Sequence, residues 1–76
     1  MMAMQTPGHI VRIGVFAARD GWLLTHPDVQ GRFEDRDEAV AAARRLAHLE
    51  TWRGREVDVQ VQESPNAPLA SLDPRA

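Results

Sequence analysis

The 76-residue sequence contains no cysteine and no lysine, and no apolar run in it approaches the length of a membrane-spanning helix. Without cysteine there are no disulfide bonds and no thiolate metal sites. A helix that crosses a bilayer needs roughly 20 consecutive apolar residues, so no membrane contact of this kind is expected. The N-terminus has neither a basic segment nor a long apolar run, which argues against a signal peptide. We therefore expect a cytoplasmic protein.

Composition bounds the size of the domain and the partners that it meets. Residues 1–8 lack periodicity, and residues 64–76 hold three of the five prolines. We expect a flexible N-terminus over 1–8, a single domain over 9–63 and a disordered proline-rich tail over 64–76. A domain of roughly 55 residues has a marginal core, for which self-association is a common remedy. The net charge of −2 argues mildly against nucleic acid as a generic partner.

The stretch from Asp35 to Leu49 predicts the single helix. Asp35 and Glu38 form a capping box at its start, and Gly54 is suited to a left-handed stop after its end. At about 100° per residue, one arc of this helix is apolar and mostly alanine. The arc holds Ala39, Val40, Ala43, Leu46 and Ala47, with Ala42 and Leu49 at its edge. Glu50 returns to the same arc, so we expect the buried part to end near Leu49.

The remaining pattern predicts four strands, at residues 9–18, 22–26, 32–34 and 56–63. The dipeptide Asp20-Gly21 favours a two-residue hairpin turn. In that register Arg19 faces Trp22, and Val15 faces His26. The predicted fold is α+β (β-β-β-α-β), a three- to four-stranded, mainly antiparallel sheet with one helix packed on one face.

Directly opposed residues share a sheet face, so the hairpin register predicts two faces. One face should meet the helix and carries Val11, Ile13, Val15, Ala17, Trp22 and Leu24. Trp22 is the largest of these side chains, and we expect it to anchor the helix. The other face has no helix to cover it and carries apolar side chains at Ile10, Phe16, Ala18 and Leu23. Scattered apolar residues are normal on surfaces, but a patch of them also suits a homodimer contact.

The sequence offers little chemistry. The histidines His9, His26 and His48 have no metal-ligand spacing, and the five glycines are isolated rather than grouped in a phosphate-binding loop. Helix capping accounts for the acidic run Glu34, Asp35, Asp37 and Glu38 without a metal. One helix and one small sheet make a poor catalytic cleft. We expect no enzymatic activity, no cofactor and no metal.

A basic cluster with an aromatic residue lies toward the end of the helix. It comprises Arg44, Arg45, Trp52, Arg53 and Arg55. Such a cluster can hold phosphates and stack a base, although cations near a helix C-terminus are also favoured by the helix dipole. The cluster therefore leaves two interpretations open, a nucleic-acid contact and a solvated helix face.

The chain resembles a family of very small bacterial proteins known only as a domain of unknown function. The likeness covers about residues 10–62 and rests on Gly21-Trp22-x-Leu24, Phe33, Glu38-Ala39 and Leu46-Ala47, followed by a valine-rich strand. The family pattern is a GW-x-V strand, an F-x-T cap and an alanine-rich helix. This chain departs from it with Asp35 in place of threonine, and it lacks the glycine-turn strand that often closes such proteins. The resemblance implies the fold and brings no activity.

A weaker likeness is to the arm-type DNA-binding domains of phage integrases and plant AP2 factors, which read DNA with a basic sheet face. The face with Ile10, Phe16 and Leu23 does not suit that use. The first functional hypothesis is a non-enzymatic bacterial domain that forms a homodimer and acts by protein–protein contacts. The alternative is a weak nucleic-acid-binding domain that uses Arg44, Arg45, Arg53 and Arg55 with Trp52.

Overall fold

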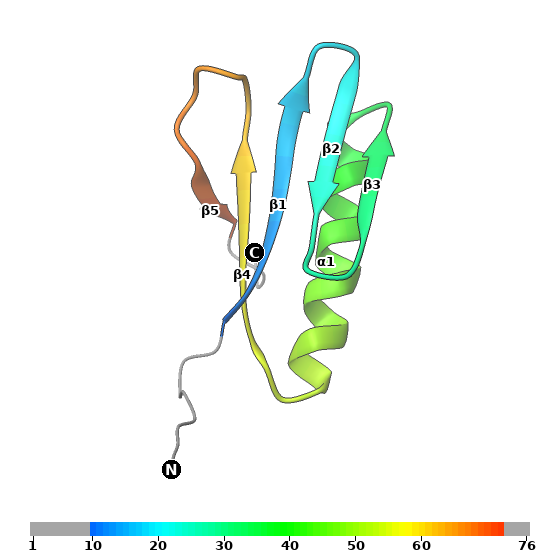
Figure 1. Ribbon diagram of the computed structural model, residues 1–76, viewed down its shortest axis with the longest axis vertical. Coiled ribbons are helices and arrows are strands. Elements are labelled where there is room, and N and C mark those ends of the chain that lie inside the picture. Colours follow the sequence, from blue (N-terminus) through cyan, green and yellow to red (C-terminus); the bar gives the residue numbers. More distant parts are fainter. Residues whose placement is uncertain (1–9, 73–76) are drawn as a thin grey trace.

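The computed structural model describes residues 10–72, which form one sheet with one helix on one of its faces (Figure 1). The elements are β1 (Ile10–Ala18), β2 (Gly21–Thr25), β3 (Gln30–Phe33), α1 (Arg36–Trp52), β4 (Glu56–Gln62) and β5 (Ala70–Leu72). The sheet has five strands in the order β3-β2-β1-β4-β5. The expected α+β class with a single helix is confirmed. The predicted ends at 1–8 and 73–76 lie outside the described residues.

The sheet is mainly antiparallel, as predicted, but it is mixed and has five strands where the sequence predicted three to four. Three strand pairings are antiparallel, and the central pairing of β1 with β4 is parallel. The parallel pair arises because α1 runs back along the sheet after β3, so that β4 starts at the same end as β1 (Figure 1). Parallel strands need such a crossover connection.

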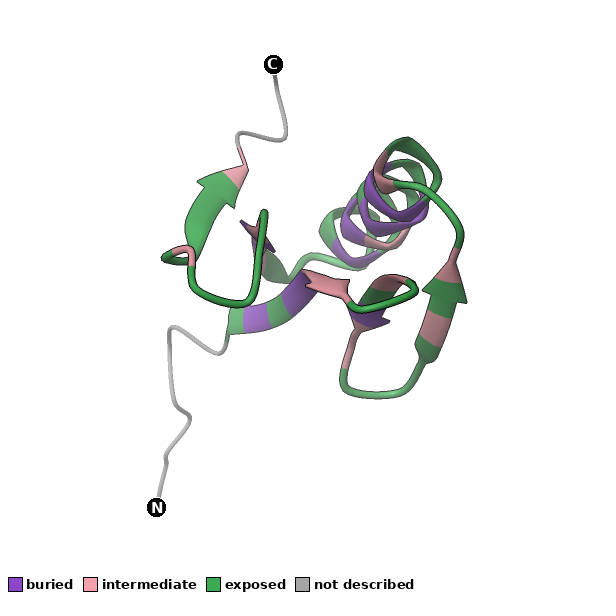
Figure 2. Ribbon diagram, turned by 90° about the horizontal axis from the view of Figure 1, so that it is seen from above, coloured by how far each residue is buried: buried purple, intermediate pink, exposed green. Residues whose placement is uncertain are grey.

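Valine and isoleucine from the two central strands form the floor of the core. Val11, Ile13 and Val15 of β1 lie beside Val57, Val59 and Val61 of β4 in the register of the pair. Above them lie alanines of α1, of which Ala39 and Ala43 are fully buried. Alanine has no side chain beyond Cβ, so the helix lies close against the sheet. The buried stripe of α1 facing the sheet is visible in Figure 2.

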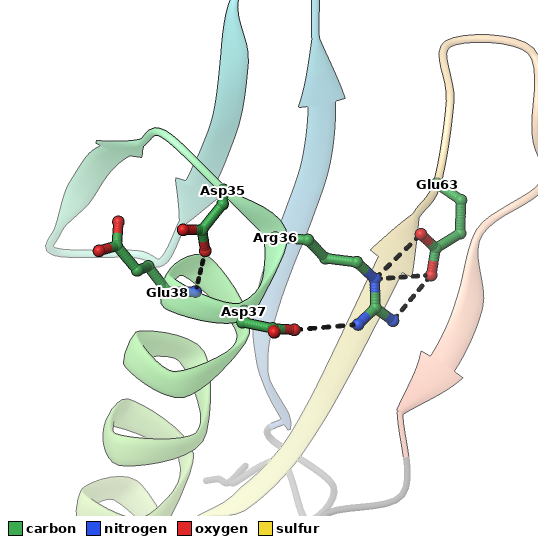
Figure 3. A network of polar contacts seen from close by, with 5 residues as sticks. All are labelled: Asp35, Arg36, Asp37, Glu38 and Glu63. Atoms are coloured by element: carbon green, nitrogen blue, oxygen red, sulfur yellow. Dashed lines mark hydrogen bonds and ion pairs between the residues drawn. The ribbon is translucent and has the colours of Figure 1, made fainter.

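The predicted helix start is confirmed. The backbone N–H of Glu38 donates a hydrogen bond of 2.9 Å to Oδ1 of Asp35, the N-cap residue (Figure 3). In the next position, Arg36 reaches out to Glu63 beyond the end of β4, and its Nη2 lies 2.8 Å from Oε2 of that carboxylate. This ion pair ties the first turn of the helix to the central strand.

The helix ends at Trp52, three residues after the predicted end at Leu49. The predicted glycine stop at Gly54 follows it. Gly54 has φ +86°, and its N–H donates to the Thr51 carbonyl oxygen at 2.9 Å. The N–H of Arg55 donates to the Glu50 carbonyl oxygen at 3.0 Å. These two bonds satisfy carbonyl groups that the end of a helix leaves unpaired.

The hairpin register differs from the prediction by two residues. Ala18 pairs with Gly21, so Arg19 and Asp20 form the turn instead of Asp20-Gly21. Gly21 has φ +151°, and a Cβ built there would lie 2.7 Å from the carbonyl oxygen of Phe33, so only glycine fits. Because a shift of two preserves the alternation, the predicted division into two faces is correct.

The predicted disordered tail over 64–76 is wrong for its first part. The chain turns after β4 and returns as β5, whose Leu72 pairs with Val59 and packs against the core. The turn is fixed by the Gln62 side chain, which donates through Nε2 to the carbonyl oxygen of Ala67 at 2.8 Å. The prolines at 65 and 68 lie in this turn, where a missing N–H costs nothing.

Candidate functional site

An apolar groove runs between α1 and the edge of the sheet formed by β3, with a volume of about 950 Å³. Its strand wall is formed by Val29, Gly31 and Phe33, with Leu24 behind them. Its helix wall is formed by Ala42, Leu46, Leu49 and Trp52. These eight residues define what we call the β3–α1 groove.

The helix wall of the groove is a second apolar stripe, beside the one that faces the core. Ala42, Leu46, Leu49 and Trp52 are spaced by four, three and three residues, which places them along one side of α1. Leu49 is 42% exposed and Trp52 is 82% exposed. Burial in α1 ends close to the predicted limit near Leu49, but the expectation that Glu50 lies outside the buried part is wrong, since Glu50 is 1% exposed. The large apolar side chains of Leu49 and Trp52 therefore lie on the surface of the protein.

Gly31 lies in the strand wall of the groove. It pairs with Leu24, whose side chain is on the helix-facing side of the sheet. A Cβ built at Gly31 would lie 3.2 Å from Cε2 of Phe33, so the Phe33 ring lies close beside this position. The φ of Gly31 is not positive, so the backbone does not require glycine here. A larger side chain would have to share this part of the groove with the Phe33 ring.

The strand wall is also an open edge of hydrogen-bonding groups. β3 is the first strand in the sheet order and is paired only with β2, over Gln30–Phe33. The other side of a lone edge strand presents unpaired N–H and C=O groups. Backbone polar groups and an apolar surface therefore lie next to each other along the groove.

The charged side chains that line the groove are arginines, Arg44 and Arg45. His48 also lines it, and no acidic residue is among the described residues that do. The chain as a whole carries a net charge of −2. The groove is thus a locally basic region of an acidic protein, which favours a negatively charged ligand.

The predicted self-association face is only partly assembled. Phe16 pairs with Leu23, and Ala18 lies two residues further along β1, so these three are neighbours on the face away from the helix. Ile10 lies six residues from Phe16 on the same strand, a separation of about 20 Å at ~3.3 Å per residue. The Phe16 ring covers Gly14, where a built Cβ would lie 2.5 Å from its Cε2. Part of the ring is therefore occupied within the chain.

The predicted arginine cluster is divided between two places. Arg44, Arg45 and Trp52 line the β3–α1 groove, as stated above. Arg53 is the C-cap residue of α1. The Arg55 guanidinium donates through Nη1 to Oε1 of Glu50 at 3.1 Å. A phosphate would therefore compete with a carboxylate for Arg55.

Sequence reasoning missed a polar triad made of His26, Glu50 and Arg55, in which the side chains of His26 and Glu50 are buried and that of Arg55 is half exposed. His26 Nε2 lies 2.8 Å from Glu50 Oε2, and the two side chains are 4% and 2% exposed. The backbone N–H of Asp28 donates to His26 Nδ1 at 3.1 Å, which places the ring proton on Nε2. His26 thus donates to Glu50 while its other nitrogen holds the turn that leads into β3.

The triad also sets the ionisation of its carboxylate. The hydrogen bond from His26 holds the pKa of Glu50 below its ordinary value, burial opposes this, and the charge of Arg55 acts with His26. The signal in the sequence was the return of Glu50 to the apolar arc, together with His26 on the helix-facing side. Both ring nitrogens of His26 are engaged, so the arrangement positions the β2–β3 turn, which carries Val29 of the groove.

Residues 10–72 hold neither a candidate metal-binding group nor a helix suited to cross a membrane. No three His, Asp or Glu side chains come together there as a metal-binding group. In the same residues no helix has the length and apolar character needed to span a bilayer. Comparisons with protein-family models, with curated proteins and with solved structures gave no match for the chain. The resemblance to the small bacterial family therefore stays a prediction.

Proposed function

We propose that this chain is a small non-enzymatic domain that acts by binding other protein chains, and that the β3–α1 groove is its contact surface. The observation that carries the proposal is Trp52, which is 82% exposed at the end of an apolar groove. Tryptophan is among the residues most enriched at binding hot spots. A concave apolar surface with a few polar groups is also the usual form of a binding site.

The face with Phe16, Ala18 and Leu23 is a second contact surface for the same function, through which two copies would form a homodimer. Leu23 is 36% exposed, and a small domain gains core by association. Phe16→Asp would then give a monomer. Sedimentation of the parent and the variant over a wide concentration range tests this, and identical sedimentation would reject the face as a dimer contact.

The groove itself is tested by photocrosslinking. A photoreactive amino acid replaces Trp52 in the full chain, and a matched chain carries it at Asn66, which is exposed in the turn between β4 and β5 and belongs to neither proposed contact surface. In host cells we expect protein adducts from position 52 that position 66 does not give. Equal adducts at both positions, or adducts that nuclease removes, would reject the groove as a protein contact.

Nucleic acid is a second candidate because Trp52 lies with Arg44 and Arg45 along one groove. An exposed aromatic can stack a base while arginines contact phosphates. Phosphate binding weakens steeply as salt rises, because it releases counterions, and apolar contacts do not behave in this way. The salt dependence of binding to single-stranded DNA therefore separates this candidate from protein binding.

A further inference from the structure

We propose that the β3–α1 groove binds an extended acidic peptide, which adds to the sheet as a strand beside β3. In this arrangement alternate apolar side chains of the peptide lie against Leu46, Leu49 and Trp52. The inference deepens the proposed function and rests on it, since it names the chemistry of the partner.

The backbone of the site suits an added strand. β3 is paired on one side only, so its free edge can form a new ladder of hydrogen bonds with a peptide. An added strand lies about 4.8 Å from its neighbour and directs every second side chain to each face. On the helix-facing side those side chains would lie in the groove beside Gly31 and Phe33, which line it. Main-chain pairing and apolar contact are therefore available to the same ligand.

The size of the groove fits several side chains. Its volume of about 950 Å³ is near the upper end of ordinary ligand pockets. The exposed apolar positions on its walls are Val29 (44%), Leu49 (42%) and Trp52 (82%). Val29 lies on the turn before β3, and Leu49 and Trp52 lie on the last turns of α1, so a ligand that covers all three must span both elements.

Charge selects the acidic peptide over a second copy of the chain. Arg45 lines the groove, and no acidic side chain among the described lining residues balances it. A symmetric pair of copies would join two identical surfaces, so that the same positive patch would face itself across the contact. Like charges brought together disfavour association, whereas glutamates flanking the apolar side chains of a peptide would neutralise the rim.

The test uses the full chain and labelled eight-residue peptides that alternate glutamate with valine or leucine. Peptides with lysine in place of glutamate reverse the charge and keep the apolar pattern. We expect the acidic peptide to bind and the lysine peptide to bind at least about tenfold more weakly. Hydrogen exchange of the amides of Gln30–Phe33 should slow when the acidic peptide binds, because a new ladder protects them.

Three variants assign the binding to the groove. Gly31→Val fills it and should raise the peptide Kd at least about tenfold, and Trp52→Ala removes the exposed anchor with a similar effect. Arg45→Glu reverses a rim charge and should weaken the acidic peptide and strengthen the lysine peptide. The matched control is Arg12→Glu, on the opposite face of the sheet, which should leave both affinities unchanged.

Several outcomes would overturn the inference. Equal binding of the acidic and lysine peptides would remove the charge argument, and binding without protection of the β3 amides would remove the added strand. If single-stranded DNA displaces the acidic peptide and binds with a lower Kd than the peptide, the groove would be assigned to nucleic acid. Self-association that Gly31→Val abolishes would assign it to a second copy. If position 52 still crosslinks to protein while no acidic peptide binds, the proposed function stands and this inference fails.

Discussion

The two flanks of α1 meet the sheet in different ways. On the flank toward β4, Arg36 closes the approach by its ion pair with Glu63, and the alanine stripe lies directly on the valines of the central strands. On the flank toward β3, a groove lies between α1 and the sheet edge and is lined by Gly31, Leu49 and Trp52. The same helix is therefore fully used for stability on one side and available for contact on the other. Substitutions on the two sides should separate stability from binding.

The largest effect should come from the closed side. Ile13 is 1% exposed between the helix and the β1–β4 pair. Ile13→Ala should cost about 2–5 kcal/mol of unfolding free energy, because it removes buried methyl groups and leaves a cavity. That is comparable with the roughly 3–5 kcal/mol that one core of this size supplies. Urea unfolding followed by circular dichroism measures it, and a loss below about 1 kcal/mol would contradict the described packing.

The second effect concerns the triad of His26, Glu50 and Arg55 and depends on pH. The pKa of Glu50 lies below its ordinary value of 4.5 in the folded chain, because His26 donates to the ionised carboxylate. The folded state therefore favours the charged form. Its contribution is complete above the ordinary pKa and is lost as pH falls from about 4.5 through the lower folded value.

Glu50→Gln is the matched variant, since it keeps the shape and cannot ionise. The variant should have a lower unfolding free energy than the parent near neutral pH. The difference between the two should narrow in acid, because protonation of Glu50 destabilises the parent. Thermal unfolding at a series of pH values measures the gap. A gap that is constant with pH would mean that the Glu50 charge adds nothing to folding.

The local parts of this fold were predictable from sequence. The Asp35 cap depends on Glu38, and the Gly54 stop depends on Thr51, so each involves residues within one helical turn. Both are confirmed. The two faces of the hairpin were also correct, because alternation survives a register shift of two. The turn itself was misplaced, since the positive φ of Gly21 is matched to the approach of Phe33, which lies twelve residues away.

The long-range parts were not predictable in the same way. The β1–β4 pairing and β5 depend on contacts between distant segments, and a short strand such as Ala70–Leu72 has too few residues to show a period. The groove was missed because it forms between β3 and α1, and no local sequence pattern shows how a strand and a helix lie relative to each other. The triad was missed because His26 and Glu50 were placed separately and no local rule joins residues 24 positions apart.

The third prediction concerns the flank of α1 toward β3, where a substitution should raise the free energy of unfolding instead of lowering it. Gly31→Val should raise the unfolding free energy by about 0.5–1 kcal/mol, because glycine in a strand interior is entropically costly and valine suits a strand. Phe33 must move slightly, since the new Cβ would lie 3.2 Å from its ring. A higher urea midpoint with lost peptide binding would show that the groove is kept at a cost in stability. A large destabilisation would mean that the space is already filled in solution.

The smallest effect on stability should come from truncating Trp52, the most exposed of the large apolar side chains in the described residues. Trp52→Ala should change the unfolding free energy by no more than about 0.5 kcal/mol, because a side chain that is 82% exposed gains little from folding. Trp22 is the matched control, since it is partly buried and packs against the core beside Phe33. Trp22→Ala should cost several times more, in line with the anchoring role expected for it. Urea titration of the two variants side by side measures both, and equal losses would mean that Trp52 packs against the chain in solution and the groove is closed.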